Sequence, residues 1–345
     1  MRNNQTKILE IDGTFGEGGG QILRSSLSLS ALTGRPFHIS NIRGGRKKGG
    51  LLRQHLTCVQ AAAQISSAKV TGAELKSREL TFEPGLIEAG TYEFNIASAG
   101  SCLLVFQTVL PILMNLDKPS TIILRGGTHN PMAPPACFLE RSFLPILRRM
   151  GVEVDMKLYK AGFYPAGGGH IEFKIYPGEQ LKPLKLDERG ASLKKSYEVE
   201  QANLPFQIAR REIDTLHEVL GWGAKHQKLI KILDSPGPGN LVILTHQFEN
   251  VSSSFCSFGT QGVAAEKVSK TAIKAYHAYL KSEAVVDEYL ADQLILPMAL
   301  ARNSSFIAHN LSLHATTNLE ITRKFLDTKI HQEDLEGSRT RVSFL

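Results

Sequence analysis

The first part of the chain alternates between segments with the patterns of strands and of helices. Residues 7–12 and 37–42 predict strands, whereas residues 21–33 and 51–66 place apolar side chains at the spacing of one helix face. Gly34 predicts the end of the first helix. The order strand, helix, strand, helix therefore predicts a small unit of α/β structure.

A comparable succession begins after about residue 90. Residues 98–114 predict an apolar helix, residues 121–127 a strand, and residues 137–151 a helix that ends at a glycine. Residues 152–158 alternate as a strand. The similarity in sequence is weak, but the order of elements indicates a repeated unit.

The polar stretch 176–190 contains Pro and Gly residues that predict a domain boundary, and the order of predicted strands and helices changes after it. Residues 196–204 predict a strand, residues 206–221 a helix, and residues 241–248 and 251–258 two further strands. This block predicts a small inserted α+β domain.

Helical spacing returns after Val263, with apolar side chains four residues apart from Val268 to Leu280. A second apolar helix is predicted over residues 286–301, and a strand over residues 305–313. A further helix follows, so the C-terminal segment predicts a third unit.

The expected fold class is therefore α+β, built from α/β repeats. We expect a large domain formed by residues 1–185 and 281–345, and a small α+β insert over residues 186–280. A chain of 345 residues with 42% apolar residues is long enough to bury such cores.

The composition favours a reduced, intracellular setting. The cysteines are far apart, show no CxxC spacing and have apolar neighbours, which predicts packed thiols rather than a disulfide framework or a zinc ribbon. No signal peptide is recognised, and no apolar run reaches the roughly 18 residues of a membrane span. We therefore expect a soluble cytoplasmic protein. The net charge of +7 is compatible with a polyanionic partner but does not establish one.

The segment Gly16–Arg24, GEGGGQILR, places glycines and a carboxylate between a strand and a helix. Glycines let backbone N–H groups approach a phosphate, and a helix N-terminus favours an anion. The segment matches neither GxxxxGK[ST] nor GxGxxG, so a tight turn without a ligand is the alternative. Glu17 would face a phosphate chiefly through a bridging divalent metal.

The segment Ile42–His55 combines two glycine pairs with a concentration of basic side chains. Guanidinium groups on a glycine-rich loop suit bidentate recognition of phosphate, although a solvated charged loop is the alternative. Gln54 could complete such contacts but is uninformative alone. The basic residues are Arg43, Arg46, Lys47, Lys48 and Arg53.

Two other segments contain candidate histidines. Residues 125–135, RGGTHNPMAPP, predict a rigid turn, in which His129 is either structural or a ligand. In SLHATTNLE, Thr317 and Glu320 form a capping-box pattern, which predicts His314 just ahead of a helix N-terminus, where phosphate is favoured. A neutral imidazole can form a covalent phosphoramidate there, although a packed histidine is the alternative.

Eight strings, in order, resemble the RNA 3'-terminal phosphate cyclase family and span nearly the whole chain. They are DGTFGEGGGQILRSSLSLSALTG, IRGGRKKGGLLRQHLT, SAGSCLLVFQTVLP, GGTHNPMAPP, GFYPAGGG, SPGPGN, EYLADQLILPMALA and HATTN.

The resemblance implies a large domain of three repeats, each a four-stranded sheet with two helices, and a smaller α+β domain that interrupts the third repeat. It also implies that the histidine of HATTN, His314, attacks the α-phosphate of ATP and carries AMP. The AMP would pass to an RNA 3'-phosphate, and the adjacent 2'-hydroxyl would then close a 2',3'-cyclic phosphate and release AMP.

The matching strings also imply roles for individual residues. Glu17 would hold Mg²⁺ or Mn²⁺. Phosphate or RNA contacts would come from Arg24, Arg43, Arg46 and Gln54. The adenosine pocket would be formed by Gln107, Tyr289, Leu290, Ala291, Asp292 and Gln293.

Two other classes of function are alternatives. A non-catalytic RNA-binding or ribosome-assembly protein could use the same scaffold, but relatives of that type lack the nucleophilic histidine, which is present here as His314. Enolpyruvyl transferases also use repeated α/β units, but they are longer and need no covalent histidine. The sequence leaves open whether the chain forms a homodimer.

Overall fold

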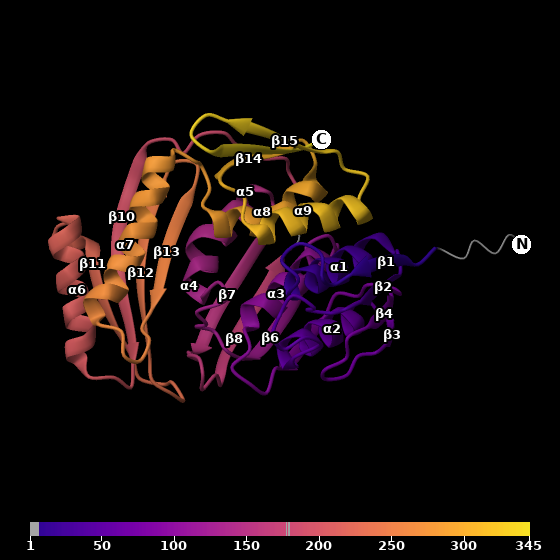
Figure 1. Cartoon of the computed structure of the whole chain (residues 1–345), viewed down its shortest axis with the longest axis horizontal. Helices are drawn as coiled ribbons and strands as arrows, with labels where there is room; N and C mark the ends of the chain where they lie inside the picture. The colour runs from indigo at the N-terminus through magenta and orange to yellow at the C-terminus, as the bar shows by residue number, and fades with distance from the viewer. Residues whose placement is uncertain (1–6, 177, 179) are drawn as a thin grey trace, which may run out of the picture.

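The computed structural model describes residues 7–345 except 177 and 179 (Figure 1). The strands form four sheets of four strands each. In Figure 1, three of these sheets and their helices lie together, while the sheet containing β10 to β13 stands to one side with α6 and α7.

The first sheet has the order β1-β2-β4-β3, with β1 and β2 parallel and the other pairs antiparallel. Helix α1 (Gly20–Thr33) connects β1 to β2, and α2 (Arg53–Ile65) connects β2 to β3. The strands are β1 (Leu9–Asp12), β2 (Phe37–Ser40), β3 (Lys69–Thr71) and β4 (Leu80–Glu83).

The second sheet has the corresponding order β5-β6-β8-β7, again with its first two strands parallel. Its strands are β5 (Thr91–Asn95), β6 (Ser120–Gly126), β7 (Glu153–Lys160) and β8 (Gly169–Tyr176). Helix α3 (Cys102–Leu113) connects β5 to β6. The helix predicted over residues 137–151 is instead α4 (Ala136–Phe138), a π-helical segment η1 (Leu139–Phe143) and α5 (Leu144–Arg149).

The third sheet has the order β15-β16-β14-β9, which is the same chain order read from the opposite edge. Strand β9 pairs in parallel with β14, although the two are far apart in the sequence. The strands are β9 (Lys185–Leu186), β14 (Ser304–His309), β15 (Ile330–Leu335) and β16 (Arg339–Phe344), and the helices are α8 (Glu288–Ala301) and α9 (Leu313–Phe325).

The fourth sheet lies between β9 and α8 in the sequence and has a different order, β11-β10-β12-β13. Its strands are β10 (Ser192–Ala202), β11 (Gln227–Ile232), β12 (Gly239–Phe248) and β13 (Ser252–Phe258). The helices of this segment are α6 (Phe206–Leu220), the short 3₁₀ helix η2 (Ala224–His226) and α7 (Ala265–Ser282). Strand β13 also contacts η1 of the second unit.

Helix α1 lies in the interior and contacts α2, α3 and α9. Every residue from Ile22 to Ala31 is buried, including the serines of this helix. The Ser26 hydroxyl donates to the Ile22 carbonyl at 2.7 Å, and the Ser28 hydroxyl donates to the Thr108 carbonyl of α3 at 2.6 Å. Satisfied hydroxyls can be buried at little cost, so α1 packs helices on several sides.

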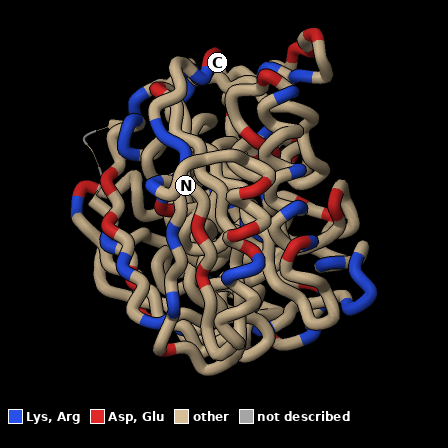
Figure 2. Tube along the Cα trace, turned by 90° about the vertical axis from the view of Figure 1, so that its left-hand side faces the viewer, with Lys and Arg blue, Asp and Glu red and all other residues tan. Residues whose placement is uncertain are grey.

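Among the described residues, the surface carries charges of both signs (Figure 2) and the cysteines form no disulfide. Figure 2, which views the molecule from the side of α6, shows basic and acidic residues interspersed rather than gathered in one basic band. Within the described ranges, no helix is both long and apolar enough to cross a membrane. All the cysteines are free thiols: Cys58, Cys102 and Cys137 are buried, and Cys256 is partly buried.

Candidate active site

The glycine-rich turn before α1 meets the first turn of α9. The Glu17 N–H donates to the Thr317 hydroxyl at 3.0 Å. Gly16 has φ +58°, and a Cβ at this position would lie 2.1 Å from Thr317 Oγ1. Only glycine therefore allows both the left-handed backbone and this close approach.

The structure corrects the expected start of the helix near His314. Helix α9 begins at Leu313 and is capped by Ser312, whose hydroxyl accepts from the Ala315 N–H at 3.1 Å. His314 thus lies within the first turn rather than ahead of it, and the Thr317 hydroxyl donates to the Leu313 carbonyl at 2.6 Å instead of capping the helix. The local positive end of the helix dipole still surrounds His314.

Glu17 lies next to two of the other candidate residues, Arg46 and His314. Its side chain is only 3% exposed and accepts from the Gln21 N–H at 3.0 Å. Arg46 forms an ion pair with the same carboxylate, and His314 Nδ1 lies 3.9 Å from Glu17 Oε2. The His314 side chain is 50% exposed, so the imidazole is reachable from solvent while its Nδ1 edge faces a buried carboxylate.

The two arginines of the basic loop have different surroundings. Arg46 faces Glu17, whereas Arg43 donates to the carbonyls of Lys48 at 2.6 Å and Gly50 at 2.9 Å. Burial and the neighbouring charge of Arg46 lower the pKa of Arg43. Arg43 also has φ +56°, which a non-glycine residue adopts at a cost. Arg43 therefore holds the loop that presents Arg46.

His55 is a neighbouring residue that sequence reasoning did not single out as a candidate. It is 8% exposed, and its Nδ1 has no hydrogen-bond partner among the described residues. Burial, together with the charges of Arg43, Arg24 and Arg46, lowers its pKa to about 3. A neutral imidazole therefore lies within the basic cluster. Its adjacency to Gln54 in the RQH string was the available signal.

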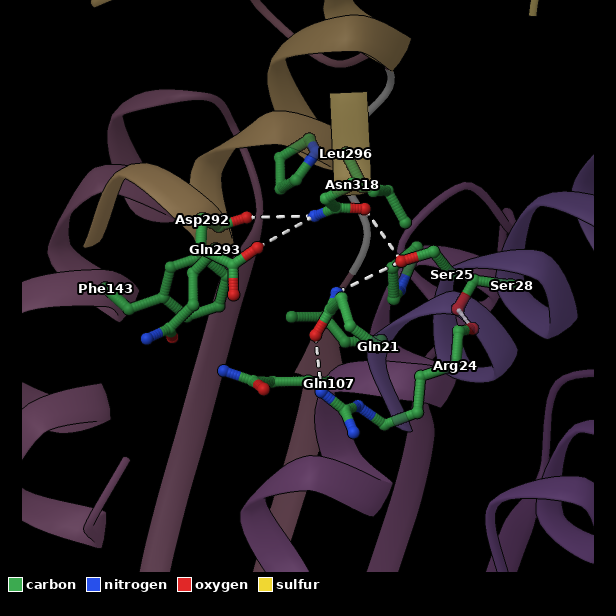
Figure 3. Close-up of a pocket in the computed structure, with 13 residues that line it drawn as sticks. Gln21, Arg24, Ser25, Ser28, Gln107, Phe143, Asp292, Gln293, Leu296 and Asn318 are labelled. Carbon is green, nitrogen blue, oxygen red and sulfur yellow. Dashed lines mark hydrogen bonds between the residues drawn. The ribbon is translucent and has the colours of Figure 1, made fainter. Parts of the chain in front are cut away.

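A cavity between α1, α3 and α8 contains several of the candidates (Figure 3). Arg24, Gln107, Asp292 and Gln293 all line it. Gln107 Nε2 is buried without a hydrogen-bond partner in the described structure. An unpaired buried donor is costly, so this amide is suited to a ligand that enters the cavity.

One hydrogen-bonded chain runs along the wall of this cavity (Figure 3). Arg24 donates to Gln21, and the Gln21 amide donates to the Ser25 hydroxyl at 3.0 Å. The Ser25 hydroxyl donates to Asn318 at 2.7 Å, and the Asn318 amide donates to the Asp292 carboxylate at 3.2 Å. Helices α1, α8 and α9 are thereby fixed relative to one another around the site.

Burial raises the pKa of Asp292. The charges of Arg24 and His314 and the hydrogen bond from Asn318 oppose that rise. The Asp292 carboxyl group thus lies between apolar surroundings, which raise its pKa, and polar neighbours, which oppose that rise.

The remaining residues of the expected adenosine segment are not gathered in the cavity. Tyr289 is 64% exposed, whereas Leu290 and Ala291 are fully buried. Successive helical residues point in different directions, so only part of a contiguous helical string can face one site. Asp287 caps this helix by accepting from the Tyr289 N–H at 3.0 Å.

Gln54 has a structural contact beside the site. Its side-chain carbonyl accepts from the N–H of Ser101 at 2.6 Å, and Ser101 is the N-cap of α3. Gln54 therefore fixes the start of the helix that carries Gln107.

His129 lies elsewhere and is 1% exposed. It contacts the Thr128 hydroxyl at 2.7 Å and Glu200 of β10 at 3.1 Å. This arrangement corresponds to the structural alternative for His129.

Metal binding at Glu17 would involve few protein ligands. In the part of the chain that the structure describes, no group of three or more His, Cys, Asp or Glu side chains is arranged to hold a metal ion. A single buried carboxylate nevertheless fits a Mg²⁺ ion, which commonly binds through one or two carboxylates together with phosphate oxygens and water.

Comparison with known proteins identifies the family. The family model described as RNA 3'-terminal phosphate cyclase matches residues 15–332. A protein of that name from Koribacter versatilis is 49% identical over 96% of this chain and 93% of its own length. Proteins of the same name from Pseudomonas fluorescens and Ralstonia nicotianae are 47% and 48% identical, over 97% of this chain in each case and 97% and 96% of their own lengths. The chain therefore belongs to the RNA 3'-terminal phosphate cyclase family.

Proposed function

We propose that this protein uses ATP to convert an RNA 3'-terminal phosphate into a 2',3'-cyclic phosphate, and that His314 carries the adenylate. The observation that supports this most strongly is the half-exposed imidazole of His314 in the first turn of α9, with Glu17 and Arg46 beside it. A helix N-terminus and a guanidinium group together favour a phosphate at that position.

The surroundings of His314 favour one nitrogen as the nucleophile. Because Nδ1 faces the Glu17 carboxylate at 3.9 Å, a proton on Nδ1 is favoured electrostatically, and the lone pair then remains on Nε2. Nε2 attacks the α-phosphorus of ATP, a bond forms between nitrogen and phosphorus, and the bond to the β-phosphate oxygen breaks. Pyrophosphate leaves with that electron pair.

The adenylate then moves to the RNA end. A 3'-phosphate oxygen attacks the adenylate phosphorus and displaces the imidazole, which yields an RNA-adenylate with a phosphoanhydride. The neighbouring 2'-hydroxyl gives up its proton to solvent and attacks the RNA phosphorus, and AMP departs with the electron pair of the broken anhydride bond as the cyclic phosphate closes. Arg24 and Arg46 offset the negative charge of these phosphates, which is the largest electrostatic demand of the reaction.

The cavity beside His314 would hold the nucleoside part of ATP. This partly apolar cavity contains both hydrogen-bond donors and hydrogen-bond acceptors, which come from Asp292, Gln293 and the unpaired amide of Gln107. Glu17 would hold Mg²⁺ or Mn²⁺, which when bound would neutralise phosphate charge at this position.

We also propose that the first three sheets are repeats of one unit and that the segment between β9 and α8, close to the expected residues 186–280, is an insertion into the third. The three sheets share the same strand order and the same parallel and antiparallel pairs, whereas the fourth has another order. The chain leaves the third sheet after β9 and returns to it through α8 and β14.

Product analysis tests the proposed reaction. RNA with a labelled 3'-phosphate is incubated with ATP and magnesium, and the fraction of label that becomes resistant to phosphatase is measured. The wild type is expected to protect the label, and His314→Ala to abolish protection, while His331→Ala, an exposed histidine on β15, serves as the matched control. RNA binding without ATP-dependent protection would instead support a non-catalytic RNA-binding protein.

A further inference from the structure

The π-helical segment η1 (Leu139–Phe143) lies between the nucleotide cavity and the fourth sheet. Phe143 lines the cavity with Asp292 and Gln293, and Figure 3 shows its ring on their side of the cavity, across from Arg24. The two residues immediately before Phe143 contact the fourth sheet instead. Three consecutive residues thus connect two separate parts of the molecule.

The contacts to the fourth sheet are polar and specific. Arg141 Nη2 donates to Glu198 Oε2 of β10 at 2.8 Å, and the Ser142 hydroxyl lies 3.0 Å from the Ser254 hydroxyl of β13. The Arg141 and Glu198 side chains are only 21% and 11% exposed. An ion pair that is shielded from water and hydrogen-bonded at this distance fixes geometry more strongly than an exposed one.

The residues that contact the fourth sheet and the residue that lines the cavity belong to the same π-helical turn. A π turn contains one more residue than an α turn, is costly, and occurs frequently at functional sites. Such a turn needs external support, and η1 receives it from β13 on one side and α8 on the other. A shift of Arg141 would therefore move Phe143, which belongs to the same turn.

We infer that Arg141 and Glu198 are positioning residues, which anchor η1 to the fourth sheet and so hold Phe143 beside Asp292 and Gln293 for binding of the nucleoside part of ATP. This rests on the proposed function, because it assigns the cavity to adenosine. The fourth sheet thereby acquires a role in nucleotide affinity, although it contributes no residue to the cavity lining.

The same strand offers a matched control. The carboxylate of Glu200, two residues after Glu198 on β10, accepts a hydrogen bond from His129 Nε2–H at 3.1 Å and so also joins the fourth sheet to the second unit. That bridge does not pass through η1. Glu198→Gln and Glu200→Gln are therefore the same substitution on the same strand, in two bridges of which only the first passes through η1.

Calorimetric binding measures the effect without turnover. ATP and inorganic tripolyphosphate are titrated into the His314→Ala protein and into its combinations with Glu198→Gln or Glu200→Gln. Glu198→Gln is expected to weaken ATP binding about fivefold, which is roughly 1 kcal/mol, and to leave tripolyphosphate binding unchanged. Glu200→Gln is expected to change neither. Adding Arg141→Met to Glu198→Gln should cause little further loss, because the pair acts as one unit.

The outcomes separate this inference from the function on which it rests. If Glu198→Gln weakened both ligands equally, or if Glu200→Gln weakened ATP to the same extent, the two bridges would be general domain contacts and the positioning role would be overturned. Unchanged ATP affinity in Glu198→Gln would overturn it as well. A parent protein that bound neither ligand would overturn the proposed function together with this inference.

Discussion

The backbone N–H of Glu17 donates a 3.0 Å hydrogen bond to the hydroxyl of Thr317, which lies 300 residues further along the chain. This bond joins the turn that carries the buried carboxylate to the helix that carries His314. The Thr317 hydroxyl in turn donates to the carbonyl of Leu313 at 2.6 Å, so it also ties down the start of α9. The spacing between Glu17 and His314 therefore depends on a contact between the two ends of the chain.

Gly16→Ala tests that dependence. The new Cβ would lie 2.1 Å from Thr317 Oγ1, so the turn and α9 must separate, and a displacement of about 1 Å can cost roughly 100-fold in rate. We expect a loss of that order in the rate of adenylate capture. Gly34→Ala is the matched control, because Gly34 also has a positive φ, of 68°, but no atom of the described residues lies within 4 Å of the added Cβ. Equal rates in the two variants would contradict the proposed coupling.

The two loop arginines are expected to respond differently to substitution. Arg46→Lys keeps a positive charge opposite Glu17 but loses the planar guanidinium, so adenylate capture should fall about 100-fold with an unchanged melting temperature. Arg43→Ala removes two hydrogen bonds to loop carbonyls and should lower the free energy of unfolding by about 1–2 kcal/mol. Thermal unfolding and single-turnover kinetics on both variants measure the two effects. A stable Arg43→Ala protein would show that its carbonyl contacts are dispensable.

Gln107→Leu is expected to weaken ATP binding without lowering the stability of the protein. Its buried Nε2 has no partner in the described structure, so Gln107→Leu removes an unsatisfied donor and should leave the melting temperature unchanged or slightly higher. ATP affinity should fall about tenfold, because the amide would no longer reach the ligand. Differential scanning calorimetry and ATP titration test the two halves of the prediction. Unaltered ATP affinity would remove Gln107 from the adenosine site.

A pH dependence is expected from Glu212, a fully buried residue of α6. Burial raises its pKa to about 7, with Asn240 opposing the rise through a hydrogen bond. Because the folded pKa is above the unfolded one, the folded state binds the additional proton between about pH 4.5 and 7. The stabilisation that comes from this proton on Glu212 is fully present below about pH 4.5 and is lost as the pH rises to about 7. The free energy of unfolding should therefore fall by roughly 3 kcal/mol across that range.

Glu212→Gln should remove this dependence. The variant is expected to gain stability over the wild type at pH 8 and to gain little at pH 5. Denaturant unfolding at both pH values measures the difference. The fluorescence of Trp222, the only tryptophan of the chain, reports on the packing of α7, because its ring centroid lies 5.6 Å from that of Tyr276 on α7. Parallel pH profiles for the two proteins would show that Glu212 does not carry the effect.

Strong periodicity made the long helices predictable, whereas short and exposed elements were missed. The apolar spacing predicts a helix over residues 206–221, and α6 is Phe206–Leu220. Strand β15 (Ile330–Leu335) has exposed side chains on both faces along most of its length, so it lacks the apolar alternation that identifies a strand. The π turn was missed because apolar side chains continue through it, and periodicity does not register one additional residue.

The site was predictable only where one segment contained the signal. The HATTN string identified His314, but the capping-box pattern assigned the cap to Thr317, whereas the structure assigns it to Ser312. Thr317 is engaged by Glu17, and Asn318 by Ser25 and Asp292. No local sequence pattern predicts such contacts between distant helices. The position of His55 among the arginines also depends on tertiary contacts, so the sequence did not predict it.

Peptide mapping after incubation with ATP and magnesium tests the central role of His314 most directly. One acid-labile adenylate is expected on the peptide that contains His314, lost on addition of RNA with a 3'-phosphate and absent from His314→Ala. An adenylate on any other residue, or continued labelling of His314→Ala, would show that His314 is not the nucleophile.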